Sequence, residues 1–262
     1  MRIQSFFVRE ISAPLVTPFR IATGQHNTLH NVFFCIELAS GVQGFGEAAV
    51  ATHITGETIE ATIRNLKEVG AALLGEDVSD YRALLGSLKE RLTGNHAALA
   101  AVEMAVLDAL TRALKIPLWR LFGEKPVPLT SDITIVIGSL EEAAAAAKAY
   151  SRQGFKAFKI KVGKDRGLDL QRVCAVRKAA PKADIILDAN QGFDAEGMLK
   201  FLKTLKAQGI RPVLLEQPVP KADWEGLQKV TRLAGTLVCA DESVGSLHDA
   251  VRAVKERSVS AI

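Results

Sequence analysis

The sequence has 262 residues, enough for one large α/β domain or for two domains with hydrophobic cores of their own. Hydrophobic residues make up 48% and charged residues 24%, which is ordinary globular composition. The net charge of +4 comes from basic residues interspersed with acidic ones and not from a basic block, which argues against a nucleic-acid-binding protein.

Cysteine usage and hydropathy restrict the class further. Cys35, Cys174 and Cys239 stand far apart and fit neither a zinc spacing nor a disulfide framework. Reduced thiols and an N-terminus without a signal-peptide pattern predict a cytoplasmic protein. No apolar run approaches the ~18 residues of a membrane span, so no membrane association is expected.

Residues 1–50 predict antiparallel strands at 3–11, 32–38 and 42–48, the last two joined as a hairpin by residues 39–41. A polar loop is predicted over 17–27. It is either a plain surface connection or, through its exposed Phe19–Arg20 pair, a ligand-contacting loop.

Residues 56–122 show the 3–4 spacing of apolar residues that is typical of helices, at 58–74, 78–92 and 96–114. Asn95 is the expected N-cap of the third helix. Pro126 and Pro128 then mark a linker. The sequence therefore predicts an α+β domain over residues 1–125.

From residue 130 strands alternate with helices. Strands are predicted at 133–137, 157–162, 184–188, 213–216 and 236–240, and a sixth begins at Val259. This rhythm predicts a parallel sheet with right-handed crossovers, and so an α/β domain over 126–262. A (β/α) barrel of the TIM type is favoured over a doubly wound sheet, because no Gly-rich phosphate loop follows the first strand. A closed barrel needs eight strands, so we expect a barrel truncated in its sixth strand.

Charged residues stand out from these apolar strands. Lys159 and Lys161 lie two residues apart on the second strand, which places both side chains on one face. Asp188, Glu216 and Asp241 each end one of the next three strands. Convergent carboxylates without Cys or His favour a hard ion, Mg2+ before Mn2+. Two alternatives stay open: the acids are solvated strand ends, or the lysines neutralise them as ion pairs.

A lysine near a second ammonium and a divalent cation is destabilised in its charged form, so Lys159 can depress the pKa of Lys161 toward that of a general base. A base beside a hard metal suits removal of a proton next to a carboxylate, through an ene-diolate. Asn190 and Gln217 are placed to orient Lys161 or the metal ligands.

Four segments carry a family resemblance in order and spacing: Lys159-Ile160-Lys161, Asp188-Ala189-Asn190, Leu215-Glu216-Gln217-Pro218 and Ala240-Asp241-Glu242-Ser243. Together they resemble the enolase superfamily, whose sites pair a Lys or His base with Mg2+. The Lys-x-Lys form resembles its muconate-lactonizing branch, and within it the dipeptide epimerases that act on L-Ala-D/L-Glu. Residues 1–125 are similar to the capping domain of this superfamily.

The resemblance implies that Lys161 takes the α-proton of a dipeptide such as L-Ala-L-Glu, that Lys159 supports it, and that Asp188, Glu216 and Asp241 hold Mg2+. Residues 17–22 and 131–135 are similar to the capping loop and first barrel strand of these epimerases. Arg20 and Thr134 are therefore expected to contact this small-molecule substrate. Members of this family commonly assemble, so a homo-oligomer is expected without any indication of its interface.

Two departures from the family pattern concern the end of the sequence. A second catalytic lysine on the sixth barrel strand and an acidic motif near the eighth strand are both absent from the sequence as given, and we expect a C-terminal truncation. The nearest rival functions are cycloisomerisation, o-succinylbenzoate synthesis and N-acyl amino acid racemisation. A metal-independent Schiff-base aldolase using Lys161 and a non-enzymatic fragment are the rivals from other classes.

Overall fold

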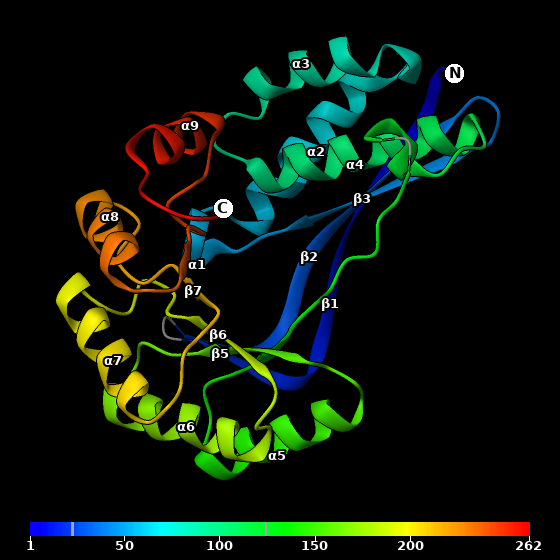
Figure 1. Ribbon diagram of the computed structural model, residues 1–262. Coiled ribbons are helices and arrows are strands. Elements are labelled where there is room, and N and C mark those ends of the chain that lie inside the picture. Colours follow the sequence, from blue (N-terminus) through cyan, green and yellow to red (C-terminus); the bar gives the residue numbers. More distant parts are fainter. Residues whose placement is uncertain (22–23, 124) are drawn as a thin grey trace. The chain divides into compact units, whose positions relative to one another are not determined.

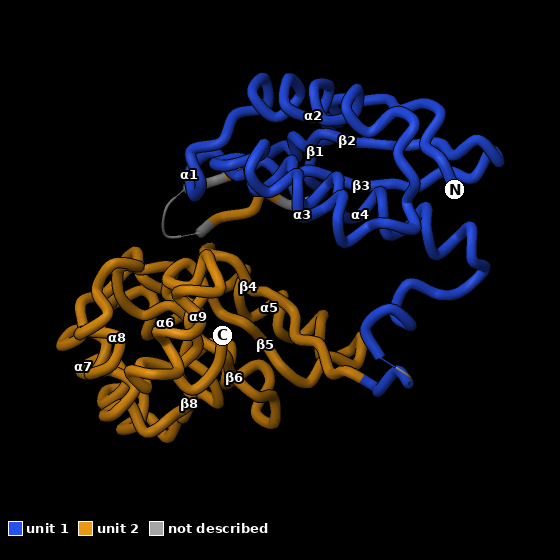
Figure 2. Tube along the Cα trace, turned by 90° about the horizontal axis from the view of Figure 1, so that it is seen from above, with its two compact units in different colours: residues 1–17, 27–128 blue, residues 18–26, 129–262 orange. Residues whose placement is uncertain are grey.

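The computed structural model describes residues 1–21, 24–123 and 125–262. The chain divides into two compact units (Figure 2). One contains residues 1–17 and 27–128, and the other contains residues 18–26 and 129–262. Ala22, in the predicted capping loop, lies outside the described residues. The domain boundary near residue 125 stays a prediction.

A three-stranded sheet begins the chain, in the order β1 (Ile3–Ile21), β2 (Gly24–Leu38) and β3 (Gln43–Ala49) (Figure 1). β2 and β3 pair antiparallel, as predicted. The polar loop predicted over 17–27 is wrong for most of its length, because β1 and β2 extend through it. Pro18 lies in this part of β1, which is an edge strand, where a residue without an N–H is tolerated.

Helices cover this sheet. The predicted segments 58–74, 78–92 and 96–114 correspond closely to α2 (Ile59–Leu73), to η1 (Val78–Asp80) with α3 (Tyr81–Arg91), and to α4 (His96–Ala113). The short helix α1 (Thr52–Thr55) and the 3-10 turn η2 (Leu118–Leu121) were not predicted. Asn95 caps α4, its side chain accepting the Ala98 N–H as predicted. α4 packs directly on β3 because Gly44 and Gly46 have no side chain at the contact: a Cβ on Gly46 would lie 1.8 Å from the Ala101 carbonyl oxygen.

The second unit contains five parallel strands that follow one another in sequence order: β4 (Ile133–Ile135), β5 (Ala157–Lys161), β6 (Asp184–Asp188), β7 (Leu214–Glu216) and β8 (Leu237–Cys239). One helix follows each strand: α5 (Leu140–Arg152), α6 (Arg166–Ala179), α7 (Ala195–Ala207), α8 (Trp224–Leu233) and α9 (Leu247–Glu256). A parallel bridge joins Cys239 to Ala261, where the sixth strand was predicted. Because the strand order does not reverse, the arrangement confirms an incomplete (β/α) barrel and excludes a doubly wound sheet.

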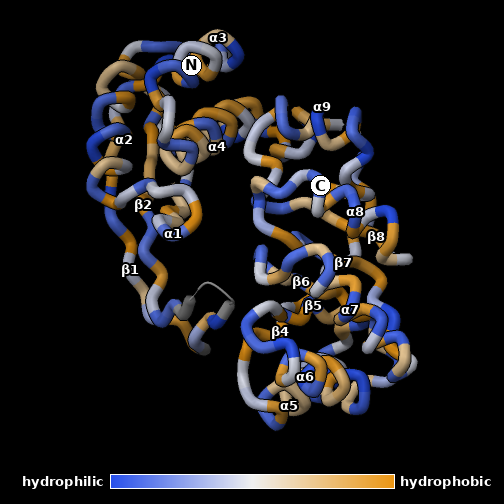
Figure 3. The backbone as a smooth tube through the Cα atoms, turned by 90° about the vertical axis from the view of Figure 1, so that its left-hand side faces the viewer, coloured by the Kyte–Doolittle hydropathy of each residue, from blue (hydrophilic) through white to orange (hydrophobic). Residues whose placement is uncertain are grey.

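Side chains along each strand alternate between the hydrophobic core and the opposite face of the sheet. Phe158 and Ile160 of β5, and Ile185 and Leu187 of β6, are buried in the core of this unit. Figure 3 shows this hydrophobic character along β4 and β5. The residues between them point to the opposite face, where the charged side chains lie. Among the described residues, no helix has both the length and the apolar character needed to cross a membrane.

The contact between β3 and α4 yields a stability prediction. We expect Gly46→Ala to lower the free energy of unfolding by about 1–3 kcal/mol or more, because the new methyl group would overlap backbone atoms of α4. Gly86→Ala is the matched control: nothing lies within 4 Å of the position that a methyl group would take there, and the residue is in the interior of α3. It should raise the free energy of unfolding by about 0.5–1 kcal/mol. Urea unfolding of both variants measures the difference, and equal midpoints would contradict the close packing.

Candidate active site

Strand register brings four polar side chains into one row across the sheet. Lys161 pairs with Asp188, Asp188 with Glu216, and Glu216 with Cys239. Lys159 lies one step back on the same face of β5, in register with Thr134 of β4. The row stands at the C-terminal edge of the sheet, which is the edge where barrels of this type carry their active sites.

The two lysines bind the two carboxylates of this row. Lys161 Nζ lies 2.5 Å from Asp188 Oδ2 and donates to Asn190 Oδ1 at 2.8 Å. Lys159 Nζ lies 2.9 Å from Asp188 Oδ2 and 2.5 Å from Glu216 Oε1. Asp188 is completely buried, so it depends on these two cations to remain charged. The structure thus has the ion pairs that the sequence left open as an alternative.

Burial and neighbouring charges shift the pKa values of Asp188, Lys159 and Glu216 in different directions. Burial raises the pKa of Asp188, but Lys161 and Lys159 outweigh it and hold this pKa below its usual range. Burial lowers the pKa of Lys159, but the hydrogen bond to Glu216 and the charge of Asp188 raise it above its usual range. Burial raises the pKa of Glu216 to about 7, aided by the charge of Asp188 and opposed by Lys159. Of these two carboxylates, Asp188 contacts both lysines and Glu216 contacts Lys159.

The segments that follow the strands hold strained backbone. Asn190, Gln191 and Gln217 have φ angles of 39°, 70° and 34°, in a region that residues with a side chain rarely adopt. Gly163, after β5, has a φ of 109°, and a Cβ there would lie 2.6 Å from the Ala189 carbonyl oxygen. Such strain clusters where a surrounding structure positions functional groups.

Gln217 joins the ends of β7 and β8. Its Oε1 accepts the backbone N–H groups of Asp241 and Ser243, at 2.9 and 3.1 Å. Its Nε2 donates to Ser243 Oγ and to the Val219 carbonyl oxygen, at 2.7 and 3.0 Å. The amide therefore positions the segment that carries Asp241, whereas Asn190 contacts Lys161 directly.

Asp241 is the predicted ligand that stands apart. Its side chain is exposed, and no group of three or more His, Cys, Asp or Glu residues in the described part of the chain is arranged as a metal site. The neighbouring Glu242 was not singled out from the sequence. Its Oε1 accepts from Asn190 Nδ2 at 3.4 Å, and its buried Oε2 has no hydrogen-bond partner among the described residues.

The chemistry of these donors fits a divalent cation. Lys159 already places one positive charge between oxygens of Asp188 and Glu216. Burial, and after it the charge of Asp188, raises the pKa of Glu216 even with Lys159 in contact, so a further positive charge beside it would favour its ionised form. Oxygen ligands alone suit Mg2+ or Mn2+, and Asp241 at the end of the next strand is the remaining candidate.

The predicted substrate contacts lie near the same edge. The Arg20 carbonyl oxygen accepts the Ile137 N–H at 3.1 Å, and its guanidinium lies 3.7 Å from Glu142. The Phe19 ring centroid lies 6.0 Å from Lys161 Nζ, within the range of a cation–π contact. Residues 18–26 therefore group with the barrel strands, although the sequence placed them in the first domain.

Sequence reasoning missed a buried ion pair under the site. Asp169 of α6 accepts the Gly163 N–H at 2.7 Å and pairs with Arg172 at 2.6 Å. Arg172 also donates to the Gly138 carbonyl oxygen at 3.1 Å. The pair thus ties the segments after β4 and β5 together. Its signal in the sequence is an Asp–Arg pair three residues apart, which ordinarily indicates an exposed helix face.

Comparison with known proteins identifies related chains. Residues 3–123 match the family model described as mandelate racemase/muconate lactonizing enzyme, N-terminal domain, and residues 141–262 match that described as enolase C-terminal domain-like. A hydrophobic dipeptide epimerase from Citrifermentans bemidjiense is 55% identical over 269 residues. That match covers 100% of this chain and 73% of the relative.

Two solved structures have the same fold. The L-Ala-D/L-Glu epimerase from Bacillus subtilis, in a substrate-liganded complex, has a TM-score of 0.95 and 36% identity, covering 99% of this chain and 73% of that one. A dipeptide epimerase from Enterococcus faecalis, complexed with Mg and L-Leu-L-Tyr, has a TM-score of 0.94 and 31% identity. It covers 99% of this chain and 73% of that one.

Two Arg–Asp pairs involving α6 allow a matched test of burial. Arg172→Leu leaves the fully buried Asp169 without its cation, and we expect a loss of about 3–5 kcal/mol in the free energy of unfolding. Arg166→Leu removes an ion pair whose side chains are 55% and 68% exposed, and should cost less than about 1 kcal/mol.

Urea unfolding measures both variants. Adding Asp169→Asn to Arg172→Leu should recover part of the loss, because it removes the unpaired buried charge. Equal losses for Arg172→Leu and Arg166→Leu would show that the buried pair does not hold the segments after β4 and β5.

Proposed function

We propose that this chain, an isomerase that belongs to the mandelate racemase/muconate lactonizing enzyme family of the enolase superfamily, epimerises a dipeptide such as L-Ala-L-Glu. The supporting observation is the buried Lys161 at the C-terminal edge, beside a carboxylate pair. The names of the relatives support the reaction class. The roles of the site residues, a cytoplasmic location and a homo-oligomeric state are further parts of this proposal.

Lys161 is the proposed base. To act as a base, Lys161 must first lose the proton that makes it one of the two cations beside Asp188. The neutral amine then has two N–H groups and one lone pair, and Asp188 Oδ2 and Asn190 Oδ1 accept two hydrogen bonds from its Nζ. The lone pair is then left to take the α-proton of the substrate. As the C–H bond breaks, its electron pair moves into the adjacent carboxylate and gives an ene-diolate.

The remaining residues would compensate the charge that develops. Lys159 stays protonated beside Asp188 and Glu216, so it presents a fixed positive charge. Asp188, Glu216 and Asp241 would hold Mg2+, or Mn2+ in its place. When bound, that ion supplies further positive charge toward the substrate carboxylate. Arg20 and Thr134 would orient the dipeptide, and Gln217 would position the segment of Asp241.

Hydrogen exchange tests the base. With L-Ala-L-Glu or L-Leu-L-Tyr and Mg2+ in D2O, proton NMR should show loss of the α-proton signal. We expect EDTA to abolish it and Lys161→Ala to slow it by about a hundredfold or more, since the general base is removed. Lys164→Ala, at an exposed lysine in the segment that follows β5, should leave the rate unchanged.

Several outcomes would contradict this assignment. Equal slowing in Lys161→Ala and Lys164→Ala, or exchange that persists in EDTA, would exclude the proposed base or metal. If neither dipeptide exchanges, the epimerase proposal is wrong, and the other acids of the muconate-lactonizing branch become the substrates to test. Covalent trapping of Lys161 by borohydride with a carbonyl substrate would favour an aldolase instead.

Metal binding can be tested without activity. Titration with Mn2+, followed by the EPR signal of the free ion, should show one site that Glu216→Gln weakens about tenfold or more. Glu196→Gln is the matched control, because Glu196 also pairs with a lysine but its side chain is 76% exposed. The same affinity in both variants would exclude Glu216 as a ligand.

A further inference from the structure

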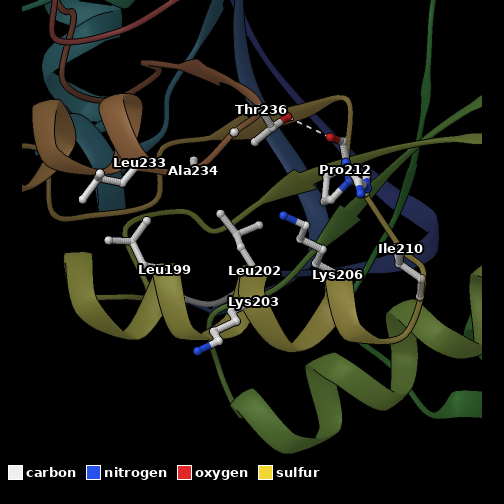
Figure 4. A pocket seen from close by; sticks show the side chains of 11 residues that line it. Leu199, Leu202, Lys203, Lys206, Ile210, Pro212, Leu233, Ala234 and Thr236 are labelled. Carbon is white, nitrogen blue, oxygen red and sulfur yellow. Dashed lines mark hydrogen bonds between the residues drawn. The ribbon is translucent and has the colours of Figure 1, made fainter.

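A pocket lies at the opposite edge of the parallel sheet from the candidate active site, where β7 and β8 begin (Figure 4). Its volume is about 360 Å³, at the lower end of the range of about 300–1,000 Å³ that is typical of small-molecule sites. Leu202 of α7 and Leu233, the last residue of α8, contribute apolar surface. Thr236 Oγ1 donates to the Pro212 carbonyl oxygen at 2.7 Å and ties the segments leading into β7 and β8.

The charged residues that line this pocket are all basic. They are Lys203 and Lys206 of α7 and Arg211, which follows it. Within the described parts of the chain, none of the three forms an ion pair. In Figure 4 the amino group of Lys206 points over the pocket, whereas that of Lys203 points away from it. The positive charge at the pocket is therefore uncompensated by side chains.

Helix C-termini offset only part of this charge. α7 and α8 both end at the pocket, and each C-terminus carries about half of a negative charge. The last turn of α7 is further capped, because the Gln208 N–H donates to the Thr204 and Leu205 carbonyl oxygens. Lys206 and Arg211 together carry two positive charges, against about one negative charge from the two helix ends, so the net field at the pocket favours an anion.

Exposed apolar surface lines the same pocket as these cations. Leu233 is 62% exposed, whereas Leu202 and Ile210, which also line the pocket, are buried. A ligand with both an acid group and an apolar part would cover this leucine and neutralise charge at the same time. Neither a neutral hydrocarbon nor a bare inorganic anion would use both features.

We propose that this pocket binds a small organic anion, an aliphatic or cyclic body that carries one carboxylate or phosphate group. The acid group contacts Lys206 and Arg211, and the apolar body lies against Leu202 and Leu233. The site is separate from the proposed active site, because its residues precede β7 and β8 whereas Asp188 and Glu216 stand at the opposite, C-terminal ends of β6 and β7. It goes beyond the proposed function and does not depend on it.

Calorimetric titration of the 262-residue chain tests the proposal with three probes. Octanoate and octyl phosphate carry the two acid groups on the same chain, and octanol carries none. We expect at least one of the two acids to bind saturably with one site per chain, and octanol to bind about tenfold more weakly or not at all. Added salt should weaken acid binding, because the rim of the pocket is exposed to solvent. The tighter acid identifies the acid group that the site prefers.

Matched variants locate the binding. Lys206→Gln and Arg211→Gln should each weaken binding of the preferred acid about tenfold, whereas Lys203→Gln removes the same charge and should keep the affinity within about twofold. Ala234→Met leaves the charge unchanged but fills the pocket, and it should also weaken binding about tenfold. Circular dichroism confirms that each variant is folded.

Three outcomes would overturn the proposal. The first is the absence of saturable binding of either acid. The second is octanol binding as tightly as the preferred acid, which would indicate an apolar site without anion recognition. The third is equal loss of affinity in Lys203→Gln and Lys206→Gln, which would indicate a diffuse effect of charge and not a pocket.

Discussion

Asp188 carries a charge at a place where no water reaches it, and the geometry of the candidate site follows from that constraint. A buried carboxylate without partners would be protonated or would destabilise the fold. Lys159 and Lys161 prevent this by contacting the same oxygen, Oδ2, at 2.9 and 2.5 Å. The other oxygen, Oδ1, accepts the Asn190 N–H at 3.0 Å. One side chain therefore fixes both lysines and the turn after β6.

This constraint also determines how the strands are used. Neighbouring parallel strands in register place equivalent residues side by side, so a residue that ends one strand meets the residue that ends the next. Lys161, Asp188 and Glu216 are such a row. Two ammonium groups and two carboxylates on one face balance in number, but burial, and after it the charge of Asp188, raises the pKa of Glu216 to about 7. The imbalance lies on the side toward β8, where Asp241 follows.

Much of this arrangement could be predicted from the sequence because it depends on local periodicity. The period of two placed Lys159 and Lys161 on one face, and the recurrence of one acid per strand–helix unit placed Asp188 beside Glu216. The length of β1 could not be predicted, since tolerance of Pro18 depends on the edge position of its strand. The contacts of Gln217 and Arg172 could not be predicted either, because they join loops that are distant in the sequence and meet only in the folded structure.

Paired and unpaired cations distinguish the two edges of the same sheet. At the C-terminal edge, Lys159 and Lys161 are buried, and their charge is tolerated only because carboxylates stand within hydrogen-bond distance. At the N-terminal edge, Lys206 and Arg211 are exposed and need no such partner for stability. Side chains of the described residues do not neutralise these two charges, and the helix C-termini offset only part of them, so a net positive field remains available to a ligand from solution. At the C-terminal edge, the lysines are paired with carboxylates of the same fold. At the N-terminal edge, Lys206 and Arg211 favour binding of an anion from solution.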